Sequence, residues 1–188
     1  MIAPLDIPVT DPSATCAAAI TSAIPTLRTS RTVLRAPRLA DFDALQAIMG
    51  SQRAVHAGGP SNPVETWGDF CAMTAIWLLR GHGMWTVETR ADDVAGFVLI
   101  GTEPGDREHE LGFLFAEAFE GLGLATEAAT AARDFAWTRL RLPSLVSYIA
   151  PGNTRSERLA RRLGATVDGT ILDGTVAVWR HPRPEGAS

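Results

Sequence analysis

The pattern of hydrophobic and polar positions switches several times along the chain between two periods. Short apolar or alternating runs predict strands, and apolar residues three or four positions apart predict amphipathic helices. The predicted strands cover residues 32–36, 84–89, 94–102, 109–115, 144–149, 166–172 and 176–180. The predicted helices cover a segment that starts at about residue 41, and residues 64–80, 124–140 and 154–163.

This order of elements predicts an α/β (α+β) fold. Hairpin turns are indicated by Asp92-Asp93, by residues 103–106 and by Asp173-Gly174. We therefore expect a single domain built on a mixed, mostly antiparallel sheet of about seven strands, with four helices.

The two ends of the chain differ in composition from the middle. Residues 1–26 are rich in Ala, Thr, Pro and Ser, which predicts a disordered or loosely packed N-terminal extension. Asp6 and Asp11 stand where a signal peptide would carry positive charge, so we expect a cytoplasmic protein. The predicted domain covers residues 27–182, and residues 183–188 are expected to form a frayed tail.

Composition and charge narrow the classes of partner. Of the 188 residues, 46% are hydrophobic and 20% are charged, which is the range of globular proteins. No apolar run approaches the ~18 residues of a membrane-spanning helix, so we expect no membrane partner. The formal net charge of -4 argues against a dedicated nucleic-acid binder, so we expect no nucleic-acid partner.

The absence of lysine excludes several chemistries. All 17 basic residues are arginine, which rules out Schiff-base chemistry, pyridoxal phosphate attachment and a P-loop lysine. Cys16 and Cys71 form no disulfide framework, so we interpret both as reduced thiols and Cys71 as a buried, small apolar residue. The four histidines show no ligand spacing, so we expect no metal.

A glycine-containing loop at residues 119–125 follows one predicted strand and opens the helix at 124–140. Gly121 and Gly123 allow backbone N–H groups to approach a ligand closely, and a helix N-terminus favours phosphate. The alternative interpretation is a tight strand-to-helix turn that binds nothing, because short glycine loops are common.

Two sets of residues match the motifs of one family. The first matches a phosphate loop that reads Gln/Arg-x-x-Gly-x-Gly/Ala and consists of Glu120, Gly123 and Ala125. The second matches an Asn-x-x-Ser motif with a later glycine and consists of Asn153, Ser156 and Gly164. Over about residues 27–182 the chain therefore resembles the GCN5-related N-acetyltransferase (GNAT) superfamily, and within it the RimJ/RimL-like branch of ribosomal-protein N-terminal acetyltransferases.

The resemblance implies a site for acetyl-CoA or CoA. In this family the fourth and fifth strands, here residues 109–115 and 144–149, splay apart and hold the pantetheine arm between them. The residues implied to bind the cofactor are Phe113, Leu114, Phe115, Leu122, Gly123, Leu124, Ala125, Thr126, Asn153 and Arg158. Asn153 is also explained as a turn or helix-cap residue, and the two roles are compatible.

The resemblance also implies two catalytic residues for direct attack of an amine on the thioester in a ternary complex. Glu110 stands where many relatives carry a catalytic glutamate, and we expect it to act as general base, directly or through water. The alternative is a solvated glutamate on an acidic strand edge that includes Asp106 and Glu108. Ser156 matches a serine proposed as the acid for the leaving thiolate; alternatively it satisfies backbone groups at the start of a helix.

The loop departs from the family pattern at Glu120 and Leu122, where relatives usually have Gln, Arg or Lys. A carboxylate beside a diphosphate is unfavourable unless it points outward, although the loop binds mainly through its backbone. Arg158, Arg161 or Arg162 are then candidates to contact the phosphates, and a solvated helix face is the alternative explanation of all three.

The function that these residues predict is transfer of an acetyl group from acetyl-CoA to a primary amine. The amine belongs to a protein or peptide N-terminus or to a small molecule, and the sequence does not separate these acceptors. A non-catalytic CoA-binding module with the same fold is the alternative. A homodimer is compatible with this fold.

Overall fold

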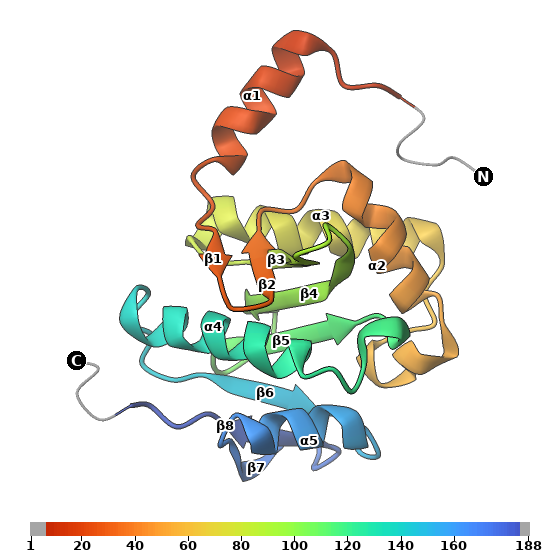
Figure 1. The fold of residues 1–188 in the computed structure, drawn as a ribbon. Helices are drawn as coiled ribbons and strands as arrows, with labels where there is room; N and C mark the ends of the chain where they lie inside the picture. The colour runs from red at the N-terminus through yellow and green to blue at the C-terminus, as the bar shows by residue number, and fades with distance from the viewer. Residues whose placement is uncertain (1–6, 185–188) are drawn as a thin grey trace.

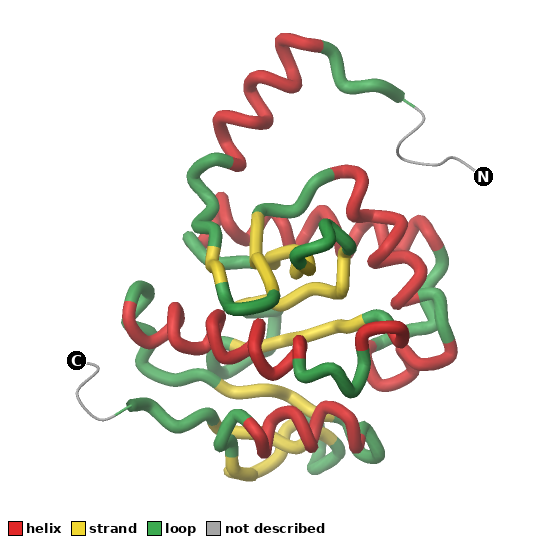
Figure 2. The backbone as a smooth tube through the Cα atoms, in the orientation of Figure 1, coloured by secondary structure: helices red, strands yellow, loops and turns green. Residues whose placement is uncertain are grey.

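A mixed sheet of eight strands forms the centre of the computed structural model, which describes residues 7–184 (Figures 1 and 2). The strands are β1 (Leu27–Arg28), β2 (Thr32–Arg35), β3 (Met84–Thr89), β4 (Val94–Gly101), β5 (Glu110–Phe115), β6 (Val146–Ile149), β7 (Thr166–Ile171) and β8 (Val176–Arg180). The α-helices are α1 (Asp11–Thr21), α2 (Phe42–Met49), α3 (Pro63–Arg80), α4 (Leu124–Thr138) and α5 (Thr154–Arg162). Short 3-10 helices are η1 (Leu39–Asp41), η2 (Gln52–Ala57) and η3 (Glu117–Phe119).

The sheet opens between β5 and β6. The strand order is β1-β2-β3-β4-β5-β6-β8-β7, and β5 and β6 are the parallel pair in an otherwise antiparallel sheet. The register between them consists of Glu110 opposite Val146, so the two strands diverge after their first residues. The expected splayed pair is thereby confirmed: residues 112–115 of β5 pair with β4 on one edge, and their other edge, toward β6, pairs with no strand among the described residues.

The two faces of the sheet carry separate hydrophobic cores. The core under α4 contains β-strand side chains such as Trp85 and Leu111, packed against alanines of that helix. The core on the other face is formed where α2 and α3 pack against β3 and β4, with Phe70 and Phe97 among its members. Strands covered on both faces consist of nearly continuous apolar residues, and this explains the pattern of β3 and β4.

A buried ion pair joins β2 to the start of α2. Arg35 donates from both terminal nitrogens to the carboxylate of Asp41, at 2.7 and 2.9 Å. Asp41 also accepts from the Thr86 hydroxyl at 2.7 Å and from the Arg38 N–H at 2.8 Å. Burial opposes ionisation, but the hydrogen bonds from Arg35, Thr86 and Arg38 hold the pKa of Asp41 below its usual range.

The N-terminal segment contains a helix that the sequence pattern did not predict. α1 has no buried residue and extends away from the sheet (Figure 1). Its alanines and a proline in its first turn favour helix formation without tertiary contacts. The expectations for residues 1–6 and 185–188 lie outside the described residues.

Two further expectations are corrected. Cys71 is exposed rather than buried, because α3 turns Phe70 and Trp77 inward and Cys71 lies about 100° further round the helix. The sheet has one strand more than the sequence predicts, because the two residues of β1 pair with β2.

None of the helices between residues 7 and 184 has the length and hydrophobicity that crossing a bilayer requires. Over the same residues, no three His, Cys, Asp or Glu side chains gather in a way that could hold a metal ion.

Candidate active site

The loop between β5 and α4 presents unpaired backbone donors. Gly121 and Gly123 have positive φ angles of 75° and 78°, which favour glycine. Gly123 occupies the N-cap position of α4 and supplies no side chain to the first turn, so the N–H groups of residues 124–126 stay free. The N–H groups of Gly121, Leu122 and Gly123 likewise find no acceptor among residues 7–184. Together with the positive end of the helix dipole, these donors suit an anion such as a diphosphate.

A cavity of about 490 Å³ lies beside this loop. Its walls come from the end of β5, from α2 and η2, from the loop itself and from α5. The residues predicted from the sequence that line it are Phe113, Leu114, Phe115, Gly123, Ala125, Thr126, Asn153, Ser156 and Arg158. Most of the residues implied to bind the cofactor therefore surround one space.

Two of the implied cofactor residues lie elsewhere. The side chain of Leu122 is exposed and lines a neighbouring hollow instead, and the side chain of Leu124 is buried and lines neither space. Since both carry free N–H groups, either residue can still contact a ligand through its backbone.

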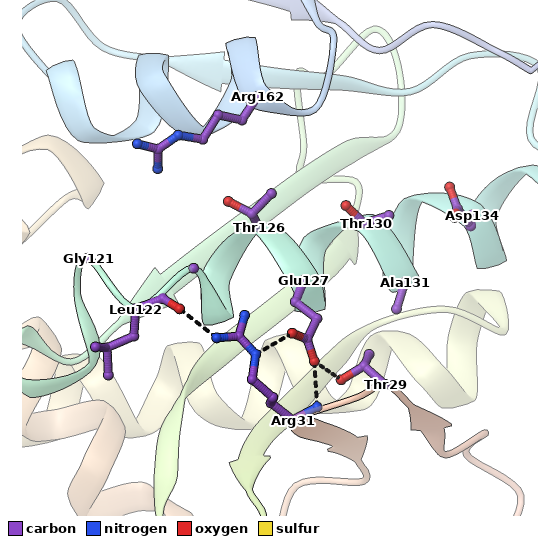
Figure 3. A pocket seen from close by; sticks show the side chains of 11 residues that line it. Thr29, Arg31, Gly121, Leu122, Thr126, Glu127, Thr130, Ala131, Asp134 and Arg162 are labelled. Carbon is purple, nitrogen blue, oxygen red and sulfur yellow. Dashed lines mark hydrogen bonds and ion pairs between the residues drawn. The ribbon is translucent and has the colours of Figure 1, made fainter.

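A second hollow, of about 730 Å³, adjoins the same loop (Figure 3). It is lined by the β1–β2 turn, by the outer face of α4 and by Arg162 of α5. Four residues line both spaces, so the two hollows meet around the loop; they are Gly121, Gly123, Thr126 and Arg162. Of the arginines proposed for the phosphates, Arg158 and Arg162 line a cavity, whereas Arg161 lies over the ring of Trp179.

Asn153 combines the two roles considered for it. Its side-chain oxygen accepts from the Ser156 N–H at 3.2 Å and so caps α5, and the residue also lines the cavity. The cap fixes the first turn of α5, which places Ser156 at the cavity wall.

Glu110 lies at the start of β5, outside the lining of the cavity. It is three residues, or about 10 Å, from Phe113 along the strand, and shares a face of the sheet with Leu114. The Tyr148 N–H donates to its Oε1 at 3.4 Å. Burial, together with the negative charges of Asp106 and Glu103, raises the pKa of Glu110 to about 7, against the opposing effect of the Tyr148 N–H.

The acidic residues around β5 are not equivalent. Glu108 accepts two hydrogen bonds from the guanidinium of Arg180, which lower the pKa of Glu108 to about 2. No cation within residues 7–184 pairs with Glu110, so its carboxyl is poised to exchange a proton near neutral pH. This difference argues against a uniform, solvated acidic edge.

Glu120 is neutralised by two arginines that the sequence pattern did not single out for this role. Arg53 of η2 pairs with Glu120 and with Glu117, and Arg155 of α5 lies 3.3 Å from Glu120. Arg155 also donates to the backbone carbonyl of Arg53 at 2.9 Å. The carboxylate therefore faces η2 and α5, where two positive charges balance it and Glu117.

Comparisons with known proteins agree with this architecture. Residues 31–166 match the family model described as the acetyltransferase (GNAT) domain. The solved structure of an acetyltransferase from Agrobacterium tumefaciens strain C58 is 41% identical, covers 85% of this chain and 95% of its own, and has a TM-score of 0.80. RimL, a ribosomal L7/L12 alpha-N-protein acetyltransferase solved with coenzyme A, is 20% identical and shares the fold with a TM-score of 0.68, over 84% of this chain and 97% of its own.

Among curated proteins, Bacillus subtilis YkkB is 36% identical over 62 residues, or 33% of this chain and 36% of YkkB. A second curated relative is matched over 42% of its length, so the chain spans less than half of each of these two relatives. The extent of the family match and the Agrobacterium structure show that the chain belongs to the GNAT acetyltransferase family.

Proposed function

We propose that the protein transfers an acetyl group from acetyl-CoA to a primary amine. The observation that carries this proposal is the row of free N–H groups at residues 121–126, next to a cavity that follows the unpaired edge of β5. A diphosphate can accept hydrogen bonds from these N–H groups. The amide groups of a pantetheine arm can pair with the unpaired edge of β5, because an open strand edge offers backbone donors and acceptors.

We assign the cofactor contacts to the residues that line the cavity. Residues 113–115 of β5 bind the pantetheine arm, and the backbone of residues 122–126 binds the diphosphate. Asn153 contacts the arm while it caps α5, and Arg158 contacts the phosphates. The proposed reaction uses no metal, and CoA is released as a product.

The chemical step needs alignment and two proton transfers. The amine nitrogen attacks the thioester carbonyl, the new C–N bond forms, and the C–S bond breaks as the tetrahedral intermediate collapses. Glu110 takes the proton of the amine, directly or through water, and Ser156 donates to the leaving thiolate. A carboxyl with a pKa of about 7 is suited to this role, because half of it is ionised at neutral pH.

The acceptor is a primary amine of a protein or peptide N-terminus, or of a small molecule. Glu103 and Asp106 lie close enough to Glu110 for their charges to raise its pKa, and the same charges attract an ammonium group. RimL is a ribosomal L7/L12 alpha-N-protein acetyltransferase, and this similarity supports a peptide N-terminus as the acceptor. We further propose that the protein works in the cytoplasm; a homodimer stays a prediction.

One observation favours the alternative of a non-catalytic CoA-binding module. Glu110 does not line the cavity, so the proposed base and Ser156 do not share one wall. The test is CoA release from acetyl-CoA, followed with a panel of peptides and small amines. Turnover that falls by about 10²-fold or more in Glu110→Gln supports the enzyme. Binding of acetyl-CoA without turnover of any amine in the panel supports the module.

A further inference from the structure

Arg31, in the turn between β1 and β2, binds the loop at the start of α4 (Figure 3). Its Nη1 donates to the carbonyl oxygen of Leu122 at 2.8 Å. Its Nε donates to Glu127 Oε2 at 2.8 Å, and its backbone N–H donates to Glu127 Oε1 at 2.7 Å. The Thr29 hydroxyl is a further partner of Glu127. The turn and the first turn of α4 are thus joined by a set of side-chain hydrogen bonds.

Glu127 keeps the guanidinium of Arg31 in place at all physiological pH values. Burial opposes ionisation of this carboxyl, but hydrogen bonds from Thr29 and from the backbone and side chain of Arg31 lower the pKa of Glu127 to about 2. Glu127 is the more buried partner, with 16% of its side chain exposed against 52% for Arg31. The carboxylate is therefore a fixed anchor for a more exposed guanidinium.

The hydrogen bond from Arg31 to the Leu122 carbonyl oxygen also fixes the direction of the next backbone donor, the Gly123 N–H. The peptide that joins Leu122 to Gly123 is trans, so its C=O and its N–H point in opposite directions. Arg31 lines the 730 Å³ hollow but not the 490 Å³ cavity, so its bond holds the C=O toward that hollow and the Gly123 N–H points away from Arg31. Gly123 also lines the 490 Å³ cavity, to which the diphosphate is assigned.

We propose that Arg31 is a positioning residue for the acetyl-CoA site: anchored by Glu127, it holds the Leu122 carbonyl and so directs the Gly123 N–H at the diphosphate. The inference rests on the proposed function and extends it to a residue outside both family motifs. It assigns Arg31 no contact with the reacting atoms. The expected signature is therefore a change in cofactor affinity without a change in the chemical step.

The test is Arg31→Gln, measured by the Kd for CoA and by steady-state kinetics. We expect the Kd for CoA and the KM for acetyl-CoA to rise about tenfold, with kcat and the KM for the amine unchanged. Glu127→Gln removes the anchor and is expected to act in the same direction. Arg31→Lys is expected to recover part of the affinity, because an ammonium can bind one of the two acceptors but lacks the planar fork.

The matched control is Arg90→Gln. Arg90 donates to the carbonyl oxygens of Ser30 and Thr29, at 2.8 and 3.2 Å, and so supports the same turn without contacting the loop. We expect this variant to bind CoA as the wild type does. An equal loss of CoA affinity in Arg90→Gln would show that the turn acts only as a structural support, and would overturn the inference.

The outcomes separate the inference from the proposed function. CoA binding by the wild type, with unchanged Kd and KM in Arg31→Gln and Glu127→Gln, overturns the inference and leaves the function standing. Failure of the folded wild type to bind CoA overturns both. If Arg31→Gln does not fold, Glu127→Gln and Arg31→Lys give the same comparison of KM against kcat.

Discussion

Arg53 of η2 is ion-paired with Glu120 of the loop that precedes α4. The pair explains how this chain carries an acidic residue where its family usually has Gln, Arg or Lys. Arg155 contacts the same carboxylate oxygen, Oε1, so the charge is balanced before any ligand binds. The acidic residue nevertheless remains at the rim of a cavity that we assign to a polyanion.

Replacing Glu120 with Gln is expected to tighten CoA binding. The change leaves the charges of Arg53 and Arg155 partly unbalanced, which adds positive potential at the phosphates. We expect the Kd for CoA to fall about threefold at low ionic strength, and the gain to shrink as salt screens it. Glu157→Gln is the control, because Glu157 carries the same charge on α5 but does not line the cavity. Weaker binding in Glu120→Gln would show that the carboxylate is needed to hold the arginines.

Activity is expected to depend on the ionisation of Glu110. The base must be unprotonated, so kcat/KM should increase with pH through about 7 and level off above it. Glu110→Gln should lower kcat by about 10²-fold or more and remove this rise. A pH profile that is unchanged in the variant would assign the ionisation to another group.

Glu110 is also expected to affect stability, and here a rise in pH acts in the opposite direction to its effect on activity. The pKa of Glu110 is raised from 4.5 in the reference state to about 7 in the fold, so the folded protein binds the extra proton between these values. Stability contributed by the protonated carboxyl is therefore lost as pH rises from 4.5 to 7. Glu110→Gln should raise the Tm more at pH 8 than at pH 4.5, as measured by thermal melting at both values. A gain in Tm that does not depend on pH would contradict the assigned pKa.

Several of these relationships could not be predicted from the sequence. The strand–loop–helix order and the two motifs are local patterns, so the fold, the loop and the position of Asn153 could be predicted from the order of residues alone. Arg31 and Glu127 are 96 positions apart, and no local pattern indicates such a contact. The partners of Glu120 come from two other segments, so only the fold reveals that its charge is balanced.

Burial is the second property that local patterns do not encode. Composition predicts Cys71 to be buried, but Phe70 and Trp77 set the inward face of α3 and leave Cys71 exposed. The resemblance implies Glu110 as the base, but a strand pattern does not show that the cavity lined by Ser156 ends short of Glu110. The sequence pattern does not predict α1, because this helix buries none of its residues and so has no apolar face that a 3.6-residue period would reveal.

The buried pair of Arg35 and Asp41 is expected to be a main support of the fold. Asp41→Ala removes the acceptor of the Thr86 hydroxyl and of two Arg35 hydrogen bonds, and leaves the guanidinium with Glu88 as its one ion-pair partner among residues 7–184. Removing one partner of a buried pair costs about 3 kcal/mol, which for a domain of this size lowers the Tm by about 10 °C. Asp43→Ala, at an exposed position in the first turn of α2, is the control and should have a small effect. Equal Tm values for both variants would contradict this role.

His181 is expected to destabilise the protein in mild acid. The Ser147 hydroxyl donates to the Leu111 carbonyl at 2.6 Å and lies 3.0 Å from His181 Nε2, so Nε2 carries a proton and donates that second bond. Burial, and then the charge of Arg133, lowers the pKa of His181 to about 4. Between pH 6.5 and 4 the unfolded chain therefore binds the extra proton, and stability decreases as pH falls.

His181→Gln tests this point, because its amide can donate to Ser147 but does not titrate. The loss of unfolding free energy between pH 7 and pH 4.5, measured in urea, should be smaller in the variant than in the wild type. His56→Gln, which replaces a histidine outside this network, should follow the wild type. An identical pH dependence for all three proteins would show that His181 does not control acid stability.

Calorimetric titration with CoA tests the central claim most directly. A valine at position 123 meets a φ of 78° and the guanidinium of Arg31, so Gly123→Val should disrupt the loop backbone. Gly174→Val introduces a similar strain in the distant β7–β8 turn and is the control. The account predicts micromolar binding of CoA by the wild type and Gly174→Val, and none by Gly123→Val. Absence of binding to the folded wild type at millimolar CoA would contradict it.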